Sequence, residues 1–299
     1  MPSVSRVAGP GALVKRPCCD LLDQAPAAVG ASRNLALRHG GGYPGRPPPS
    51  VRAAATIPAC QTRTVHIAEL WRYPVKSLQG EQVTETDIGP VGLAGDRHWA
   101  LVDLQTGHTL TARREPKLLF ASGRLSGDGV ELTLPDGTKT ADNDVLTAWL
   151  GRPVTLREAS TAMTATYEIA VDSEDETGSE WVSWQGPDAA FHDSGDARVS
   201  LLSTATIDGW DRRRFRPNIL LEGGGEDGLV GSTVALGTAR LQVVKHIERC
   251  VMTTRPQSGG IDRDLDVLRT INRDRAGLLA VGALVSTPGR ARVGDAIGA

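Results

Sequence analysis

From Val65 to its end, the chain consists of short apolar runs that glycine and proline interrupt every few residues. Residues 130–134 alternate strictly between apolar and polar side chains, and the hairpin signal Asp136-Gly137 follows them. Comparable strand-like runs cover residues 65–71, 98–103, 199–202, 218–221, 233–236, 239–246, 278–285 and 291–297. Short strands at close spacing predict a mainly β (α+β) fold made of two β-barrel-like modules.

Three stretches favour short helices, at about residues 143–150, 204–214 and 264–273. The Asp142-Asn143 pair offers a cap for the first helix, and Gly151 ends it. The Ser203-Thr204 pair can cap the second helix, and Asp264 caps the third. The third helix is expected to place three apolar residues on one side: Leu265, Leu268 and Ile271.

The first 62 residues differ in composition from the rest. They carry seven Lys or Arg against two Asp, and they hold nine of the 18 prolines. Such a segment cannot bury enough apolar surface to offset its ordering entropy, so we predict a disordered leader over residues 1–63. A basic leader is also typical of an organellar transit peptide, and a third interpretation is that translation starts near Val65. We therefore expect a cytoplasmic protein, or an organellar one if the leader is a transit peptide.

The overall charge argues against two classes of partner. A net charge of -2 gives no electrostatic reason to expect nucleic acid or a membrane surface, and no apolar run approaches the roughly 18 residues that span a bilayer. The stretch 159–197 contains an acidic cluster, made of Asp172, Glu174, Asp175, Glu176 and Glu180. We interpret it as a solvated connection between a domain at 64–176 and a domain at 177–299.

Cys250 is the only cysteine outside the predicted leader, so the folded part can form no disulfide framework and no multi-cysteine metal site. Its neighbourhood is basic, with Lys245, His246, Arg249 and Arg255. Basic neighbours favour the thiolate, which is a soft ligand for transition metals. A small buried hydrophobic residue is the plainer interpretation of a lone cysteine.

A second motif is Arg216-Pro217-Asn218. Pro217 fixes the backbone before a strand, which holds Arg216 at the strand entrance. A guanidinium there can bind a phosphate with two hydrogen bonds, and Asn218 can add a donor. The preceding run 212–214 is interpreted as the solvated end of the predicted helix.

Two further motifs can present cations at strand ends. Lys76-Ser77 follows a strand that Pro74 interrupts, and the pair forms either an ordinary polar turn or an anion cradle. Gly92 and Gly95 permit a tight turn that presents Arg97 at the start of the next strand. Each motif alone is unspecific.

Together, four motifs resemble the MOSC-domain family, whose members are similar to the C-terminal part of molybdenum cofactor sulfurase. The motifs occur in the family's order and approximate spacing: Tyr73-Pro74-Val75-Lys76-Ser77, Gly95-Asp96-Arg97, Phe215-Arg216-Pro217-Asn218-Ile219 and Arg249-Cys250. The resemblance covers about residues 64–298 and extends to a MOSC N-terminal β-barrel domain. Within the family, the chain looks like the bacterial and mitochondrial amidoxime-reducing enzymes, which reduce N-hydroxylated compounds.

The resemblance implies a molybdenum cofactor (Mo-molybdopterin) held between the two β-rich modules. Cys250 matches the cysteine that binds molybdenum, and would be both the metal ligand and the catalytic residue. The positions that match pterin and phosphate contacts are Lys76, Ser77, Arg97, Arg216, Asn218 and Arg249, with Ser203 and Thr204 as further polar contacts. The family also carries a general association with pyridoxal phosphate binding.

The chain departs from the family pattern after the cysteine. Many relatives have an Asp-Pro pair there, whereas this chain has Pro256-Gln257, which puts an acidic contact near the metal in doubt. The chain has no cysteine set for an iron–sulfur cluster, so electrons are expected from a separate flavoprotein, ferredoxin or cytochrome b5-type protein.

The resulting hypothesis is a molybdenum-dependent oxidoreductase that reduces small N-hydroxylated substrates. One alternative is a non-catalytic protein that carries the molybdenum cofactor, or sulfur on Cys250. Another is a cysteine hydrolase that pairs Cys250 with His246 or His192. His246 precedes Cys250 by four residues on one strand, a spacing that separates the two by roughly 13 Å. The last alternative is a β-barrel interaction protein without catalytic activity.

Overall fold

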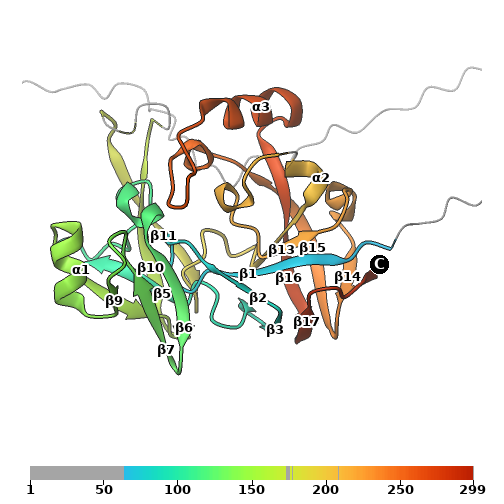
Figure 1. Cartoon of the computed structure of the whole chain (residues 1–299), viewed down its shortest axis with the longest axis horizontal. Coiled ribbons are helices and arrows are strands. Elements are labelled where there is room, and N and C mark those ends of the chain that lie inside the picture. Colours follow the sequence, from blue (N-terminus) through green and yellow to red (C-terminus); the bar gives the residue numbers. More distant parts are fainter. Residues whose placement is uncertain (1–63, 173–175, 177, 208, 299) are drawn as a thin grey trace, which may run out of the picture. The chain divides into compact units, whose positions relative to one another are not determined.

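The computed structural model describes residues 64–298, apart from 173–175, 177 and 208 (Figure 1). The predicted disordered leader at residues 1–63, like Glu174 and Asp175 of the acidic cluster, lies outside the described residues. Strands dominate the described part, which confirms the prediction of a mainly β fold.

An eight-stranded sheet forms the largest element, with the strand order β18-β14-β15-β16-β12-β13-β1-β2. Its strands in chain order are β1 (Ile67–Arg72), β2 (Glu81–Val83), β12 (Val199–Ser203), β13 (Ile219–Leu221), β14 (Thr233–Leu236), β15 (Ala239–Glu248), β16 (Leu278–Thr287) and β18 (Ile297–Gly298). Neighbouring strands are antiparallel except β12 and β13, which are parallel. The sheet takes strands from both sides of residue 177, because β1 lies between β13 and β2.

Four smaller sheets complete the described part. They are β17 (Gly289–Arg292) with β3 (Glu85–Gly89) and β4 (Gly92–Leu93), β5 (Trp99–Asp103) with β9 (Val154–Glu158), β6 (Ser122–Ser126) with β7 (Gly129–Thr133) and β8 (Lys139–Thr140), and β10 (Thr164–Ala170) with β11 (Trp181–Asp188). One apolar core lies against the large sheet, and a second gathers side chains between Val75 and Val154.

The first and third predicted helices are present. Helix α1 (Asn143–Leu150) has Asp142 as its N-cap and Gly151 as its left-handed C-cap, as predicted. Helix α3 (Leu265–Arg275) begins after the predicted cap Asp264, whose side chain accepts a hydrogen bond from the Asp266 amide.

The apolar side predicted for α3 is right at Ile271, which is buried, and wrong at Leu265. Val267 and Ile271 are its buried residues, whereas Leu265 is 40% exposed. Leu265 stands at the first helical position, where its side chain projects beyond the surface that the rest of the helix covers. The buried spacing is therefore i, i+4 from Val267.

The second predicted helix is also wrong in length. It is divided into α2 (Thr204–Ile207) and the 3₁₀ turn η2 (Arg212–Arg214). Gly209 lies between them with a φ of 87°, a left-handed conformation that interrupts a helix. The other 3₁₀ turns are η1 (Pro116–Phe120), η3 (Glu226–Leu229) and η4 (Val251–Thr254).

The stretch that was predicted to be a solvated connection is mostly a hairpin. Strands β10 and β11 pair from Thr164↔Asp188 to Ala170↔Trp181. Ala165 and Tyr167 alternate inward along β10, and Tyr167 is fully buried. The described members of the acidic cluster, Asp172, Glu176 and Glu180, lie between these two strands.

Candidate functional site

Cys250 lies where β15 ends and the turn η4 begins, at the strand end that the sequence predicted. Its carbonyl oxygen accepts hydrogen bonds from the Thr253 amide (3.1 Å) and the Thr253 hydroxyl (3.0 Å). The residue is half-buried and its thiol is free. The closed turn fixes the backbone of this half-buried cysteine.

Arg249 is held beside Cys250 by backbone carbonyls. Its Nε donates to the Leu279 carbonyl (2.8 Å) and its Nη1 to the Phe215 carbonyl (3.0 Å). Burial lowers the pKa of Arg249 to about 10, although Cys250 acts in the opposite direction. The Nη2 group is buried and has no hydrogen-bond partner. A buried donor without a partner is costly, so this group is available to a ligand.

Arg113 approaches Cys250 from the segment between β5 and η1. Burial lowers the pKa of Arg113, but a hydrogen bond and charge interaction with Cys250 outweigh burial and raise it. Its Nη1 is buried without a hydrogen-bond partner. The sequence analysis did not identify Arg113, because nothing local distinguishes it from the adjacent Arg114.

Glu176 joins two of the arginines near Cys250. Its Oε1 lies 3.8 Å from Arg113 Nη1, and its Oε2 forms an ion pair with Arg255. Arg255 also donates to the Ala112 carbonyl (2.8 Å). Only 12% of the Glu176 side chain is exposed, so the prediction of a solvated residue is wrong here. The hairpin carries Glu176 inward to two cations, an effect of folding that composition does not reveal.

Three predicted cations, Lys76, Arg97 and Arg216, gather around aromatic rings. The guanidinium carbons of Arg97 and Arg216 lie 5.1 and 4.2 Å from the centroid of the Tyr73 ring. Lys76 Nζ lies 4.5 Å from the centroid of the Tyr167 ring. Burial and then the charge of Arg97 lower the pKa of Arg216 to about 10, which places the two guanidinium groups close together.

The backbone near these cations is strained. Among the described residues, six non-glycine residues have a positive φ, and three of them are predicted ligand contacts: Ser77 (68°), Arg97 (50°) and Arg216 (51°). Each such residue costs of order 1–3 kcal/mol, and strain of this kind concentrates at functional sites. The strain supports a ligand-binding role for the cluster, because glycine would satisfy the same backbone at lower cost.

Asp193 lies among these cations. Its Oδ1 is 2.7 Å from Lys76 Nζ, and its charge also acts on Arg97, Arg113 and Arg216. The surrounding protein favours the neutral acid, but Lys76 and Arg97 outweigh that effect and lower the pKa of Asp193 to about 2. The shared influence of Asp193 joins the cation cluster and the Cys250 neighbourhood into one site.

Ser77 and Asn218 are turned toward the protein backbone. Ser77 Oγ accepts a hydrogen bond from the Ala112 amide (3.0 Å), next to Arg113. Asn218 Oδ1 accepts from the Ser200 amide (3.1 Å) and hydroxyl (3.0 Å), and its Nδ2 donates to the Trp71 carbonyl (3.3 Å). Both side chains therefore connect the segments that carry the site.

Ser203 and Thr204 stand at the end of β12. Thr204 is exposed and its hydroxyl accepts from the Gly223 amide (3.0 Å). Ser203 is fully buried, and its hydroxyl has no hydrogen-bond partner. Their contacts do not bring them to the cations or to Cys250, so their predicted ligand role stays a prediction.

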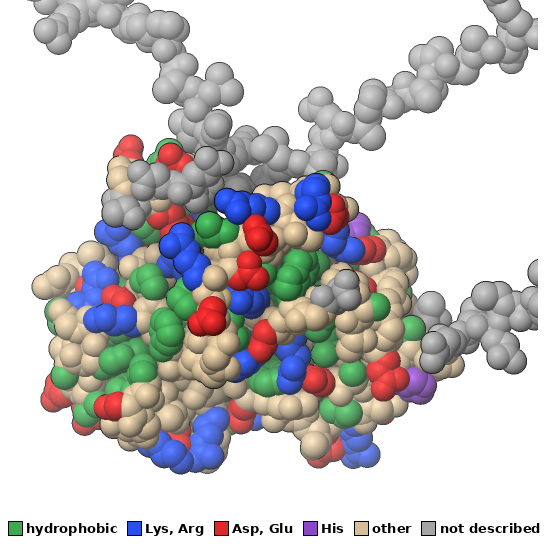
Figure 2. All heavy atoms as spheres, turned by 45° about the horizontal axis from the view of Figure 1, so that its top comes forward, with side chains coloured by type: hydrophobic (Ala, Val, Ile, Leu, Met, Phe, Trp, Pro, Cys, Tyr) green, Lys and Arg blue, Asp and Glu red, His purple; other side chains and the backbone are tan. Residues whose placement is uncertain are grey.

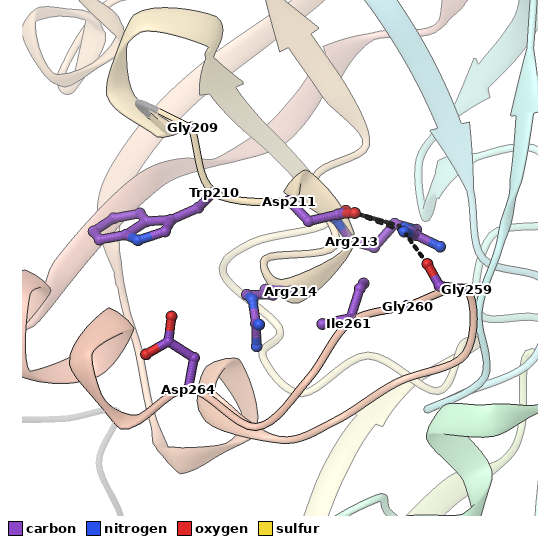
Figure 3. A pocket seen from close by; sticks show the side chains of 9 residues that line it. All are labelled: Gly209, Trp210, Asp211, Arg213, Arg214, Gly259, Gly260, Ile261 and Asp264. Carbon is purple, nitrogen blue, oxygen red and sulfur yellow. Dashed lines mark hydrogen bonds and ion pairs between the residues drawn. The ribbon is translucent and has the colours of Figure 1, made fainter.

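The arginines of η2 support the cysteine turn. Arg214 donates to the Thr253 carbonyl (3.2 Å) and the Asp262 carbonyl (2.7 Å), and Arg213 donates to the Gly259 carbonyl (3.2 Å). They border a cavity of about 190 Å³ that Trp210 and Asp264 also line (Figure 3). The prediction of a solvated helix end is wrong, because η2 packs against η4 and binds the loop that follows it.

Cations outnumber carboxylates in the combined site. The cations are Lys76, Arg97, Arg113, Arg216, Arg249 and Arg255, and the carboxylates are Asp96, Glu176 and Asp193. On the face shown in Figure 2, by contrast, basic and acidic side chains are interspersed. With six cations and three carboxylates, the site is suited to an anionic ligand.

The described residues lack two features, a cluster of metal-binding side chains and a helix that could span a membrane. Among residues 64–298 that the structure describes, no group of three or more His, Cys, Asp or Glu is arranged to hold a metal ion. In the same part of the chain, no helix has both the length and the apolar character needed to cross a bilayer.

Two family models match the chain in succession. The MOSC N-terminal beta barrel domain matches residues 64–184, and the MOSC domain matches residues 185–298. The YuaD protein of Bacillus subtilis is a similar solved structure, with 12% identity, a TM-score of 0.37, and coverage of 78% of this chain and 94% of that one.

Curated relatives include proteins named mitochondrial amidoxime-reducing component 1. The mouse protein is 26% identical over 77% of this chain and 81% of its own length. The Xenopus laevis protein is 28% identical over 72% of this chain and 74% of its own. The human protein is 43% identical, but over 23% of this chain and 20% of its own length.

Proposed function

The chain belongs to the MOSC-domain proteins that carry a MOSC N-terminal β-barrel domain, and from this premise we propose that it is a molybdenum-cofactor-dependent reductase of N-hydroxylated compounds. The names of the mouse and Xenopus relatives support the reaction class. The observation that carries the proposal is the cluster of Lys76, Arg97 and Arg216, whose backbone is strained at Ser77 and at both arginines, and which Asp193 and Arg113 connect to Cys250.

The donor set fits a molybdenum–pterin cofactor. A phosphate group carries two negative charges, and the three buried cations offer several charged donors. A thiolate suits molybdenum, and Cys250 is a half-buried cysteine with a free thiol. Arg249 Nη2 and Arg113 Nη1 are buried donors. Arg249 Nη2 has no partner in the protein, while Arg113 Nη1 forms no hydrogen bond but lies 3.8 Å from Glu176 Oε1.

Different residues of the site would bind different parts of the cofactor. Lys76, Arg97 and Arg216 would hold the phosphate, and Cys250 would bind the metal. Arg113 and Arg249 place two cations beside Cys250, where they would face the metal end of an anionic cofactor. When bound, the cofactor supplies the two-electron chemistry that removes oxygen from an N–OH group.

The residues beside Cys250 would position the substrate. The free Nη1 of Arg113 can donate a hydrogen bond to a polar substrate group. Glu176 supplies an acidic contact near the metal position, although this chain lacks the Asp-Pro pair of many relatives. The carboxylate therefore comes from the β10–β11 hairpin instead of from the cysteine loop.

Electrons are proposed to come from a separate redox protein of the flavoprotein, ferredoxin or cytochrome b5 type. The word "mitochondrial" in the names of the relatives supports the organellar alternative, in which residues 1–63 act as a transit peptide. These two proposals can be tested independently of the site, by reconstitution with a defined donor and by N-terminal sequencing of the native protein.

The direct test is to purify the chain from a host that makes molybdenum cofactor, and to measure molybdenum, pterin and reduction of a benzamidoxime. We expect near-stoichiometric molybdenum in the wild-type protein, and loss of activity in Cys250→Ala. Ser258→Ala serves as a control in the following loop. Undiminished reduction by the Cys250→Ala variant would overturn the assignment. Bound cofactor without turnover with any donor would instead favour the carrier alternative.

A cysteine hydrolase is not supported by the geometry. His246 Nε2 faces Asp227 at 3.7 Å, and His192 Nε2 contacts the Val91 carbonyl at 3.0 Å. Burial lowers the pKa of His192 to about 4. Neither histidine contacts Cys250, whose charged neighbours are arginines that cannot act as general bases.

A further inference from the structure

The ion pair between Lys76 and Asp193 is unequally buried. The two atoms Lys76 Nζ and Asp193 Oδ1 are 2.7 Å apart, yet the exposed fraction is 5% for the Lys76 side chain and 79% for Asp193. A buried cation thus depends on a carboxylate that solvent reaches. Asp193 can rotate away without opening the core, whereas Lys76 cannot.

The other two cations of the cluster have different partners. Arg97 pairs with Asp96, whose side chain is completely buried and cannot leave. Arg216 donates to the Leu78 carbonyl and lies over the Tyr73 ring. Asp193 is therefore the one exposed carboxylate described beside these three cations, and its charge acts on all of them.

The backbone around Asp193 is anchored on both sides. The Phe191 amide donates to the Arg97 carbonyl (2.8 Å), and the Phe191 side chain is fully buried. On the other side, Lys245 Nζ donates to Ser194 Oγ (2.8 Å). Only the carboxylate is free to move, so its displacement requires a side-chain rotation and no rearrangement of the loop.

We propose that Asp193 is an internal counter-ion that occupies the place of the ligand's phosphate, and that a dianionic group must displace it. The inference rests on the proposed function and deepens it, because it assigns a specificity-determining role at the phosphate end of the site. A monoanion would bring no more charge than Asp193 already supplies. A phosphate monoester carries two negative charges, and it would pair with the cations from which Asp193 is displaced.

The test uses the full chain produced without molybdenum cofactor, and titration calorimetry with inorganic phosphate. Asp193→Asn removes the competing charge and is expected to bind phosphate at least about tenfold more tightly than wild type. Asp196→Asn is the matched control. It removes an equal charge three residues away, where the carboxylate faces Lys245 at 3.8 Å. We expect its phosphate affinity to change less than about twofold.

A second readout is thermal unfolding of the same proteins, with circular dichroism to show that each is folded. Without phosphate, Asp193→Asn should melt below wild type, because Lys76 loses its carboxylate partner and keeps only the Phe191 carbonyl (3.1 Å) and the Tyr167 ring. Phosphate should raise the melting temperature of the variant more than that of wild type. Phosphate affinity that is unchanged or weaker in Asp193→Asn would overturn the inference. The proposed function is judged separately, by molybdenum in wild-type protein from a cofactor-making host.

Discussion

Arg216 lies with its guanidinium carbon 4.2 Å from the centroid of the Tyr73 ring, inside the protein. Tyr73 is itself 1% exposed, and its hydroxyl donates to the Pro217 carbonyl (3.2 Å). The ring and the arginine thus support each other at the junction between β1 and β13. The contact explains how a guanidinium is kept charged and oriented without an acid of its own.

Replacement of Tyr73 separates packing from ligand binding. Tyr73→Leu should lower the free energy of unfolding by about 2–4 kcal/mol, and should reduce molybdenum occupancy because Arg97 and Arg216 lose their common support. Tyr73→Phe keeps the ring, and should cost about 1 kcal/mol for the hydroxyl. Urea unfolding and metal analysis check both variants. Equal molybdenum occupancy in Tyr73→Leu and Tyr73→Phe would contradict the proposal that the Tyr73 ring supports Arg97 and Arg216.

Gly80 leaves no space for a side chain beside Tyr73. A Cβ atom at this position would meet the Arg72 carbonyl oxygen at 2.3 Å and Tyr73 Cδ1 at 2.5 Å. Gly80→Ala should therefore destabilise the protein by more than about 2 kcal/mol, because one obstacle is backbone. Gly89→Ala is the control, since nothing lies within 4 Å of its Cβ position. Thermal unfolding of the two variants should differ clearly.

Glu176 should couple the hairpin to the arginines near Cys250. Glu176→Gln removes the charge that pairs with Arg113 and Arg255. Because these groups are only partly exposed, we expect the free energy of unfolding to fall by about 1–3 kcal/mol. The KM for an N-hydroxylated substrate should change more than the molybdenum content. Glu180→Gln, an exposed residue in the same hairpin, should change neither quantity. If Glu176→Gln lost molybdenum and kept its KM, Glu176 would contribute to cofactor binding and not to substrate binding.

His192 predicts how stability depends on pH. Its pKa falls to about 4 in the folded protein because it is buried, against about 6.5 for the unfolded chain. Between these values the unfolded state binds the extra proton, so stability falls as pH is lowered from 6.5 to 4, by about 3 kcal/mol at most. Urea unfolding at pH 7 and pH 4.5 measures the loss. His192→Asn should show a smaller loss, and an equal loss would assign it to other groups.

Local patterns were sufficient for much of the fold. The strict alternation at residues 130–134 became β7, and the Asp142 and Gly151 caps bound α1. Lys76, Arg97 and Arg216 were identified individually from turns and strand ends. The convergence of Arg97 and Arg216 on Tyr73 was not predictable from spacing, because it depends on β1 pairing with a strand far along the chain.

The missed features have a common physical origin. Arg113 and Glu176 look like ordinary surface charges in the sequence, and they matter only because the hairpin and the segment after β5 meet near Cys250. The same holds for Arg214 of η2, which donates hydrogen bonds to carbonyl groups of the segment that follows Cys250. Such roles depend on which segments the fold brings together, and charge patterns do not encode that.

The position of β1 has a consequence for synthesis of the chain on the ribosome. One edge of β1 pairs with β2 within a few residues, as at Leu70↔Val83, but its other edge pairs at Leu70↔Ile219. At about 5–20 residues per second, the second partner is completed roughly 10–30 seconds after the first. During that interval the strand that leads into Lys76 presents an open edge. The cation cluster thus cannot assemble until translation has passed Arg216, more than two thirds of the way along the chain.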